Sequence, residues 1–204
     1  MTYLHNFLTR TLTSVAQVCL QDSPVTGAFF LLAIALYSPM YAVLALAGAV
    51  VANAYAQSKV VSGTLKEADI QNGLYGFNGT LIGISVAAFL PVNGLSLLFM
   101  GLACVFSVQL VIWVAQRSQI SLFTMPFIVV AMFVYGLGQS LNVSGALVNP
   151  MFSQSFALPI FEGIGQIFLL PNAMSGVCIL LGFLVASVRV FFITLWSVGL
   201  AYLL

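Results

Sequence analysis

Two long stretches of the chain contain no Asp, Glu, Lys, Arg or His, and they limit the possible folds more than any other feature. They run from residue 70 to 116 and from residue 118 to 161. Soluble domains carry about a quarter charged residues to keep their surfaces hydrated, whereas 4% of this chain is charged and 62% is hydrophobic. The apolar runs are too long and too continuous for barrel strands, in which apolar and polar residues alternate. The sequence therefore predicts an all-α integral membrane protein, a polytopic helical bundle in a lipid bilayer.

Prolines and polar clusters divide the chain into expected helices and loops. Residues 1–14 are predicted to be an interfacial lead-in, and apolar runs are predicted at 25–37, 40–56, 71–90 and 95–115. The first two runs are near the lower length limit for crossing about 30 Å of hydrocarbon, so they could cross only with little tilt. Loops are predicted at 139–159 and at 57–71, where Lys59, Lys66, Glu67 and Asp69 cluster.

The segment 121–138 has Thr124 and Pro126 near its start. Proline suits the first turn of a helix, because its missing N–H would have no partner there. A half-length helix that enters from a loop is one interpretation of this segment.

The stretch 71–90 mixes polar side chains and glycines into an apolar run. Four polar residues lie there, Asn72, Tyr75, Asn78 and Thr80, with glycines at Gly73, Gly76, Gly79 and Gly83. Small residues at this spacing let a neighbouring backbone approach closely. Backbone amides without partners cost several kcal/mol in hydrocarbon, so a segment of this kind must face protein or a water-lined cavity. Helix packing alone would explain the glycines but not the amides.

The chain repeats part of itself 149 positions further on, without a gap. Gln17 falls on Gln166, and Thr26-Gly27 falls on Ser175-Gly176. The sequence predicts an internal duplication, with residues 1–140 as a complete first repeat, 141–160 as a connecting loop and 161–204 as the start of a second repeat. Second copies of Gly73–Gly79 and Thr124–Phe127 would lie beyond Leu204, so the second repeat is expected to be incomplete. Shared apolar composition is the alternative explanation.

Several classes of chemistry lack the residues that they need. His5 is the only histidine and precedes the first apolar run, so nucleophilic catalysis has no base in the membrane. Cys19, Cys104 and Cys178 have no metal-ligand spacing, and neither an enzyme, a metal, a cofactor nor a nucleic-acid partner is predicted. Coupled carriers commonly place ionisable groups inside the membrane, so the uncharged stretches disfavour proton or sodium coupling.

The polar residues expected to be buried are all neutral. They are Gln17, Asn72, Asn78, Thr80, Thr124 and Gln166, with Tyr75, Phe77, Phe123 and Phe127 close by. Amide and hydroxyl oxygens accept hydrogen bonds, and flat aromatic faces can enclose a planar solute. This set suits a small uncharged molecule rich in N–H donors. Alternatively, Gln17 and Gln166 merely pair helices within the bundle.

Three segments of the chain resemble motifs of the urea transporter family. Residues 73–79, GLYGFNG, look like the most specific motif of that family, and residues 122–127, LFTMPF, are similar to its LPxLTxPF signature. Gln17 followed by Ser23-Pro24 and Thr26-Gly27 looks like the segment near the start of each half. The chain departs from the pattern at Ser121, where the signature has proline, and by lacking the second copies of the two motifs.

The resemblance implies two inverted homologous halves, each with five spans and a tilted half-length pore helix, one pore per protomer and a homotrimer. It implies passive, channel-like urea permeation across the cell (inner or plasma) membrane. Carried over by position, Thr124 is the constriction hydroxyl, Gln17 and Gln166 are the amides at the pore entrances, and the remaining pore residues are Leu20, Tyr75, Phe77, Asn78 and Phe168. Structural roles in the motifs are expected for Gly73, Gly76, Gly79 and Pro126.

Other functions stay open from the sequence. The solute could be ammonia, water or another amide, and a chain without a complete second half could be a non-transporting membrane subunit. Lys59 and Lys66 favour the cytoplasm for the loop that carries them.

Overall fold

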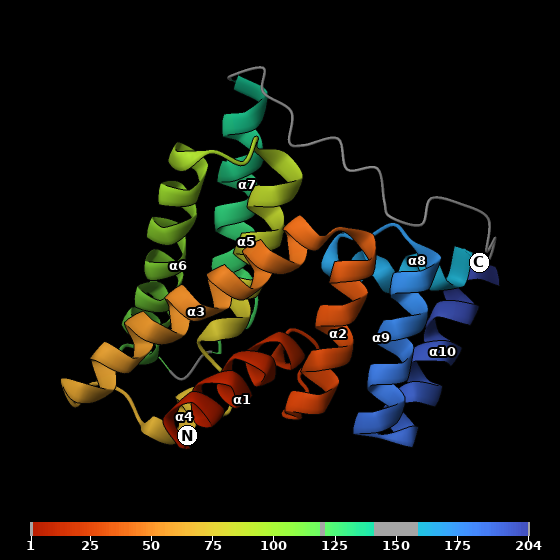
Figure 1. Ribbon diagram of the computed structural model, residues 1–204, viewed down its shortest axis with the longest axis horizontal. Coiled ribbons are helices and arrows are strands. Elements are labelled where there is room, and N and C mark those ends of the chain that lie inside the picture. The colour runs from red at the N-terminus through yellow and green to blue at the C-terminus, as the bar shows by residue number, and fades with distance from the viewer. Residues whose placement is uncertain (1, 119–120, 141–158, 204) are drawn as a thin grey trace.

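The structure, a computed structural model, describes residues 2–118, 121–140 and 159–203, with only the backbone at 2–5, 159, 202 and 203. Throughout these ranges the regular elements are helices (Figure 1), so the predicted all-α class is confirmed. In chain order they are α1 (Thr2–Gln17), α2 (Pro24–Tyr37), α3 (Pro39–Val61), α4 (Glu67–Gln71), α5 (Gly76–Phe89), α6 (Gly94–Ala115), α7 (Met125–Ser140), α8 (Pro159–Gly165), the 3-10 helix η1 (Gln166–Phe168), α9 (Ala173–Ala186) and α10 (Val188–Leu203).

Prolines and capping side chains set most helix starts. Pro24 begins α2 after Ser23, whose hydroxyl oxygen accepts from the Thr26 N–H at 3.3 Å. Asn93 begins α6 with a capping box that it forms with Ser96. These side chains satisfy backbone donors that the first turn of a helix leaves unpaired. The predicted starts of both helices are therefore within one residue of the observed ones.

Two expectations about segment boundaries are wrong. The apolar run predicted at 40–56 continues as α3 to Val61, through the start of the predicted aqueous loop, and α4 forms at the end of that loop. The predicted lead-in is helical from Thr2 onward and belongs to α1. Charged residues keep a segment out of the hydrocarbon core, but they do not end a helix, because Gln, Lys and Ala all favour the helical backbone conformation. The predicted connecting loop 139–159 lies almost entirely outside the described residues.

Helix length separates α3 and α6 from the other described helices. With 23 and 22 residues, both are long and apolar enough to cross a membrane. The 14 residues of α2 reach only about 21 Å at 1.5 Å per residue, which is less than the roughly 30 Å of a hydrocarbon core. Residues 160–168 and α9 form a pair bent by 77°, which is long enough only when the two parts are taken together.

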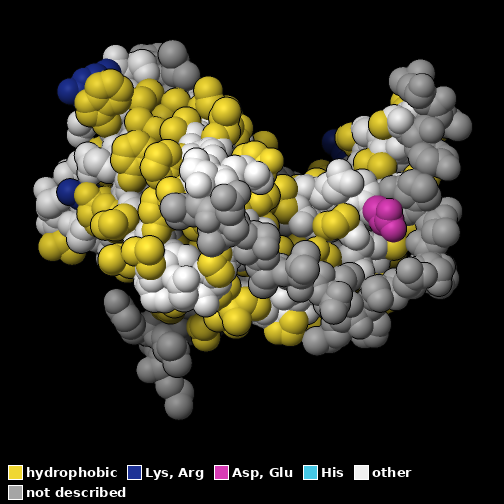
Figure 2. Space-filling view, turned by 90° about the horizontal axis from the view of Figure 1, so that it is seen from above, with side chains coloured by type: hydrophobic (Ala, Val, Ile, Leu, Met, Phe, Trp, Pro, Cys, Tyr) yellow, Lys and Arg dark blue, Asp and Glu magenta, His cyan; other side chains and the backbone are white. Residues whose placement is uncertain are grey.

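Helix α5 lies at the centre of the first part of the fold. It packs against α3, α6 and α7, and its residues from Gly76 to Ala87 are all buried. On the other side of the molecule, α2 packs against α9, which α8 and α10 flank (Figure 1). On the face that Figure 2 shows, hydrophobic side chains cover much of one end of the molecule, as expected for helices that face lipid.

The segment around α9 has the same backbone course as the segment around α2. Both helices have 14 residues, and both follow a leucine in the left-handed region, Leu20 with φ 57° and Leu169 with φ 59°. Asn172 caps α9 as Ser23 caps α2, and an extended serine ends each helix. Each pair of matching residues is 149 positions apart.

Two hydrogen bonds join α2 and α9 in a reciprocal way. The Thr26 hydroxyl donates to the Gly182 carbonyl at 3.3 Å, and the Ser175 hydroxyl donates to the Ala33 carbonyl at 2.8 Å. Ser175 and Gly182 are the residues that match Thr26 and Ala33 at the 149-residue offset. When one residue contacts a second, and their repeat counterparts make the same contact in the opposite direction, the two segments are typically related by a two-fold axis.

Candidate functional site

A pocket of about 420 Å³ lies where α1 ends, α5 begins and the chain passes from α6 to α7. It brings together three of the residues predicted from the sequence, Gln17, Leu20 and Phe77. Phe123, predicted to lie close to the buried polar residues, also lines the pocket. The other lining residues were not predicted as pore residues; they are Leu74, Val111, Ala115, Ser118, Ser121 and Leu122. We refer to this cavity as the Gln17 pocket.

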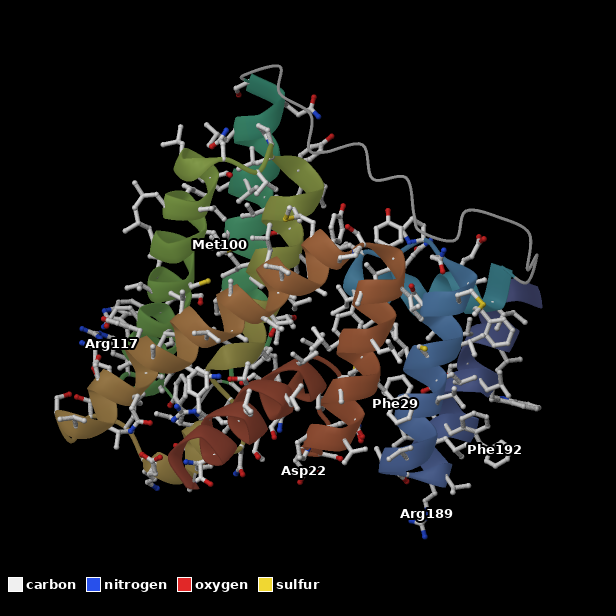
Figure 3. The ribbon with its side chains drawn as sticks, viewed as in Figure 1. Asp22, Phe29, Met100, Arg117, Arg189 and Phe192 are labelled. Atoms are coloured by element: carbon white, nitrogen blue, oxygen red, sulfur yellow. The ribbon has the colours of Figure 1, made fainter. Side chains whose placement is uncertain are left out.

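Among the described residues, none that lines the Gln17 pocket has an ionisable side chain. Its polar side chains are the Gln17 amide and the hydroxyls of Ser118 and Ser121. Arg117, next to Ser118, points away from the bundle (Figure 3), and its guanidinium lies 4.4 Å from the centre of the Trp113 ring. The cation is therefore held outside the pocket, which keeps neutral donors and acceptors between apolar walls.

The turn after α1 exposes Leu20 to the pocket. Leu20 has φ 57°, and its N–H donates to the Gln17 carbonyl at 3.0 Å. The left-handed conformation is unfavourable for a side chain with a Cβ. It ends α1 sharply and leaves Leu20 68% exposed at the pocket wall.

Asn78 fixes the segment that carries Thr124. Its Nδ2 donates to the Phe123 carbonyl at 3.1 Å, and its Oδ1 accepts from the Phe127 N–H at 3.3 Å. Asn78 is 2% exposed, so both ends of a buried amide are satisfied by backbone on either side of Thr124. The Asn78 side chain bonds this loop and is not among the residues that line the pocket.

Thr124 lies directly before α7, where its carbonyl accepts from the Ile128 N–H at 3.0 Å. Its side chain is half-buried, and its hydroxyl has no hydrogen-bond partner among the described residues. Phe123, the residue before it, lines the Gln17 pocket and has φ 43°. Pro126 is buried in the first turn of α7. Thr124 is thus next to the pocket with a free hydroxyl.

The glycines of residues 73–83 let backbones touch. A Cβ on Gly79 would stand 2.3 Å from the Gly48 carbonyl oxygen, and one on Gly83 would stand 2.0 Å from that of Leu44. Gly73 has φ 74°, and a Cβ on it would overlap the Ser14 backbone. A Cβ on Gly76 would overlap the Ser14 hydroxyl. This close contact fixes α5, and Phe77 with it, against α1 and α3. Tyr75 is half-buried just before α5 and is not among the pocket-lining residues.

The predicted residues of the second segment are not gathered in the Gln17 pocket. Gln166 lies exposed in η1, and Phe168 is 0% exposed, with its ring centre 5.4 Å from that of Phe30. The expected burial of Gln166 is wrong, and so is that of Asn72, which is exposed just after α4. Leu169 is the residue whose backbone matches Leu20, and the 149-residue offset could have identified it.

The sequence matches a known protein family over most of its length. The family model described as urea transporter matches residues 8–204. This match includes every described helix from α2 to α10, most of α1 and the residues that line the Gln17 pocket. The chain therefore belongs to the urea transporter family.

Proposed function

We propose that this protein lets urea cross a membrane passively, along a path that includes the Gln17 pocket. Membership of the family implies urea transport across a membrane. The observation that carries the finer proposal is the uncharged lining of the pocket, in which Gln17, Leu20 and Phe77 meet the loop before α7.

The chemistry of this lining suits urea. The amide oxygen of Gln17 and the hydroxyls of Ser118 and Ser121 can accept hydrogen bonds from the N–H groups of urea. Leu20, Phe77 and Phe123 supply apolar walls for a flat molecule. An ion would lose its hydration shell here without gaining a counter-charge, which is costly in a low-dielectric site. The pocket therefore favours a neutral solute.

Thr124 is proposed as the hydroxyl at the constriction. The hydrogen bonds from Asn78 to the backbone on both sides hold the loop in place, and the hydroxyl is free to bind a solute. In this proposal Gln166 and Tyr75 belong to the same path beyond the Gln17 pocket. Leu169 takes the place in the second segment that Leu20 has in the first, while Phe168 packs behind it against Phe30.

We also propose that residues 1–140 and 161–204 are homologous, inverted repeats that residues 141–160 connect. The matched caps, the two left-handed leucines and the reciprocal hydroxyl contacts between α2 and α9 support this. A homotrimer in the cell membrane completes the proposal. Large apolar side chains are exposed along α6 and are suited to contact lipid or another subunit. They are Leu95, Leu97, Leu98, Leu102, Phe106 and Trp113.

Passive transport predicts that urea flux follows only the urea gradient. Stopped-flow light scattering on proteoliposomes measures this flux. We expect a rate well above that of empty liposomes and unchanged by an imposed pH or sodium gradient, because the described residues that line the pocket are all uncharged. Flux that follows either gradient would contradict the proposal. A larger increase over empty liposomes in the flux of ammonia or water than in the flux of urea would assign a different solute.

The hydroxyl of Thr124 can be tested by Thr124→Val, with Thr124→Ser as the matched control. Loss of one neutral hydrogen bond to the passing solute, worth about 1 kcal/mol, should slow urea flux roughly fivefold. The serine variant keeps the hydroxyl and should keep most of the flux. If the valine variant, inserted and folded, conducts urea like the parent protein, Thr124 is not the constriction.

A further inference from the structure

A second pocket, of about 350 Å³, lies beside the N-terminal half of α1. Its lining comes from α1, the end of α3 and α4, and consists of Asn6, Phe7, Arg10, Gln57, Val61, Glu67 and Gln71. We refer to it as the Arg10 pocket. In Figure 1, α4 is beside the N-terminal end of α1, at the lower left. None of these residues belongs to the Gln17 pocket.

Arg10 is a buried cation with unused hydrogen-bonding capacity. It is 6% exposed, and its Nη1 donates to the Gln57 side-chain oxygen. Its guanidinium carbon lies 5.6 Å from the centre of the Phe7 ring. Its Nε is buried without a hydrogen-bond partner among the described residues. A guanidinium carries five N–H donors, and Gln57 accepts from only one of its nitrogens, so Arg10 can still donate to an acceptor that enters this pocket.

Glu67 supplies the opposite chemistry on the other side of the pocket. Its two oxygens accept from Gln57 Nε2 at 2.9 Å and from Gln71 Nε2 at 2.8 Å. These hydrogen bonds, that from Gln57 foremost, lower the pKa of the Glu67 carboxyl, so the group is ionised at neutral pH. One cation and one anion therefore line the pocket, and their charges cancel. Neither an anion nor a cation is favoured there.

The chain itself demonstrates which group fits between these charges. The carboxamide of Gln57 accepts from Arg10 with its oxygen and donates to Glu67 with its nitrogen. Urea carries the same carbonyl oxygen and N–H₂ groups in one plane, and Phe7 offers it a flat apolar face. We propose that the Arg10 pocket is a second urea-binding site, outside the Gln17 pocket, in which the solute bonds to the guanidinium and the carboxylate as the Gln57 amide does.

The position of this site relates it to the transport path. Arg10 and Gln17 are two turns apart on α1, about 10 Å along the helix. Gln71, which lines the Arg10 pocket, is one turn before Leu74, which lines the Gln17 pocket. The inference rests on urea being the solute, as proposed above, and adds a place where urea is held before or after it passes the Gln17 pocket.

Crystals of the full chain soaked in selenourea test this proposal, because anomalous scattering locates selenium. We expect a selenium peak in the Arg10 pocket and another in the Gln17 pocket. In Glu67→Leu, whose side chain is exposed in the parent protein, the first peak should fall at least fivefold, by loss of one hydrogen bond, and the second should stay. Lys66→Leu is the matched control, since Lys66 is also exposed but does not line the pocket, and it should keep both peaks.

The outcomes separate this inference from the proposed function. An empty Arg10 pocket in the parent protein, or an undiminished peak there in Glu67→Leu, overturns the second site, while normal urea flux in proteoliposomes would leave the proposed function intact. Selenium in the Arg10 pocket of a chain that conducts no urea would support the second site and reject the transport path.

Discussion

At the scale of single residues, Asn78 shows how one buried amide organises the candidate site. Its side chain donates to Phe123 and accepts from Phe127, so it determines where the loop between α6 and α7 lies relative to α5. A polar residue within an apolar run was recognisable in the sequence. Its partners were not, because they are 45 and 49 positions away and become neighbours only when α5 and α7 pack.

We predict that Asn78→Ala destabilises the protein and slows urea flux. The change removes the partner of the Phe123 carbonyl and of the Phe127 N–H in two part-buried hydrogen bonds, which we expect to lower the free energy of unfolding by about 1–2 kcal/mol. It also frees the loop that holds Thr124. Thermal unfolding in detergent and liposome flux measure the two effects. Asn72→Ala, at an exposed asparagine of the same stretch, should change neither, and equal behaviour of the two variants would contradict the role of Asn78.

At the scale of helices, the contact between α3 and α5 depends on glycines that face each other. Gly48 and Gly79 each lie so close to the opposite backbone that a Cβ would overlap a carbonyl oxygen. The spacing of small residues predicted a close approach, and α3 is the helix that makes it. The sequence could not name α3 as that partner, because α3 and α6 are both apolar helices with a glycine, at Gly48 and Gly101.

Alanine substitutions can separate contact glycines from free ones. We predict that Gly79→Ala pushes α5 away from α3 and destabilises the protein by about 1–3 kcal/mol, as overpacking does. Gly101→Ala is the control, because a Cβ there meets nothing within 4 Å. It should stabilise α6 by about 0.5–1 kcal/mol, since glycine weakens a helix interior. Thermal unfolding of both variants checks the signs, and a harmless Gly79→Ala would mean that the two helices can separate at little cost.

At the scale of the whole molecule, α2 and α9 join the first part of the chain to the second. Thr26 and Ser175 make the reciprocal contacts across this junction, and both side chains are fully buried. The aromatic rings of Phe30, Phe168 and Phe183 pack beside them. Phe168 is buried within this junction, and for that reason its side chain does not line the Gln17 pocket.

If the two contacts are equivalent, removing either hydroxyl should have the same effect. We predict that Thr26→Val and Ser175→Ala each lower stability by about 0.5–1 kcal/mol, which is typical of hydrogen bonds between helices in membranes. Ser197→Ala, at an exposed serine of α10, should leave stability unchanged. Thermal unfolding of the three variants in detergent provides the comparison. A clear loss in one of the two junction variants and none in the other would argue against a two-fold relation between α2 and α9.

The sequence by itself determined the helical membrane class, the starts of α2 and α6 and the family, because hydrocarbon, proline and capping side chains act on residues close together in the chain. It also identified Gln17, Leu20 and Phe77 as residues of interest. Only the tertiary structure decided that these three meet Ser121 and Phe123 in one pocket, that Phe168 is covered by Phe30, and that Arg10 is buried beside Glu67. These outcomes depend on which helix faces come together, and in a chain whose helices are apolar nearly all around, local sequence carries little information about that choice.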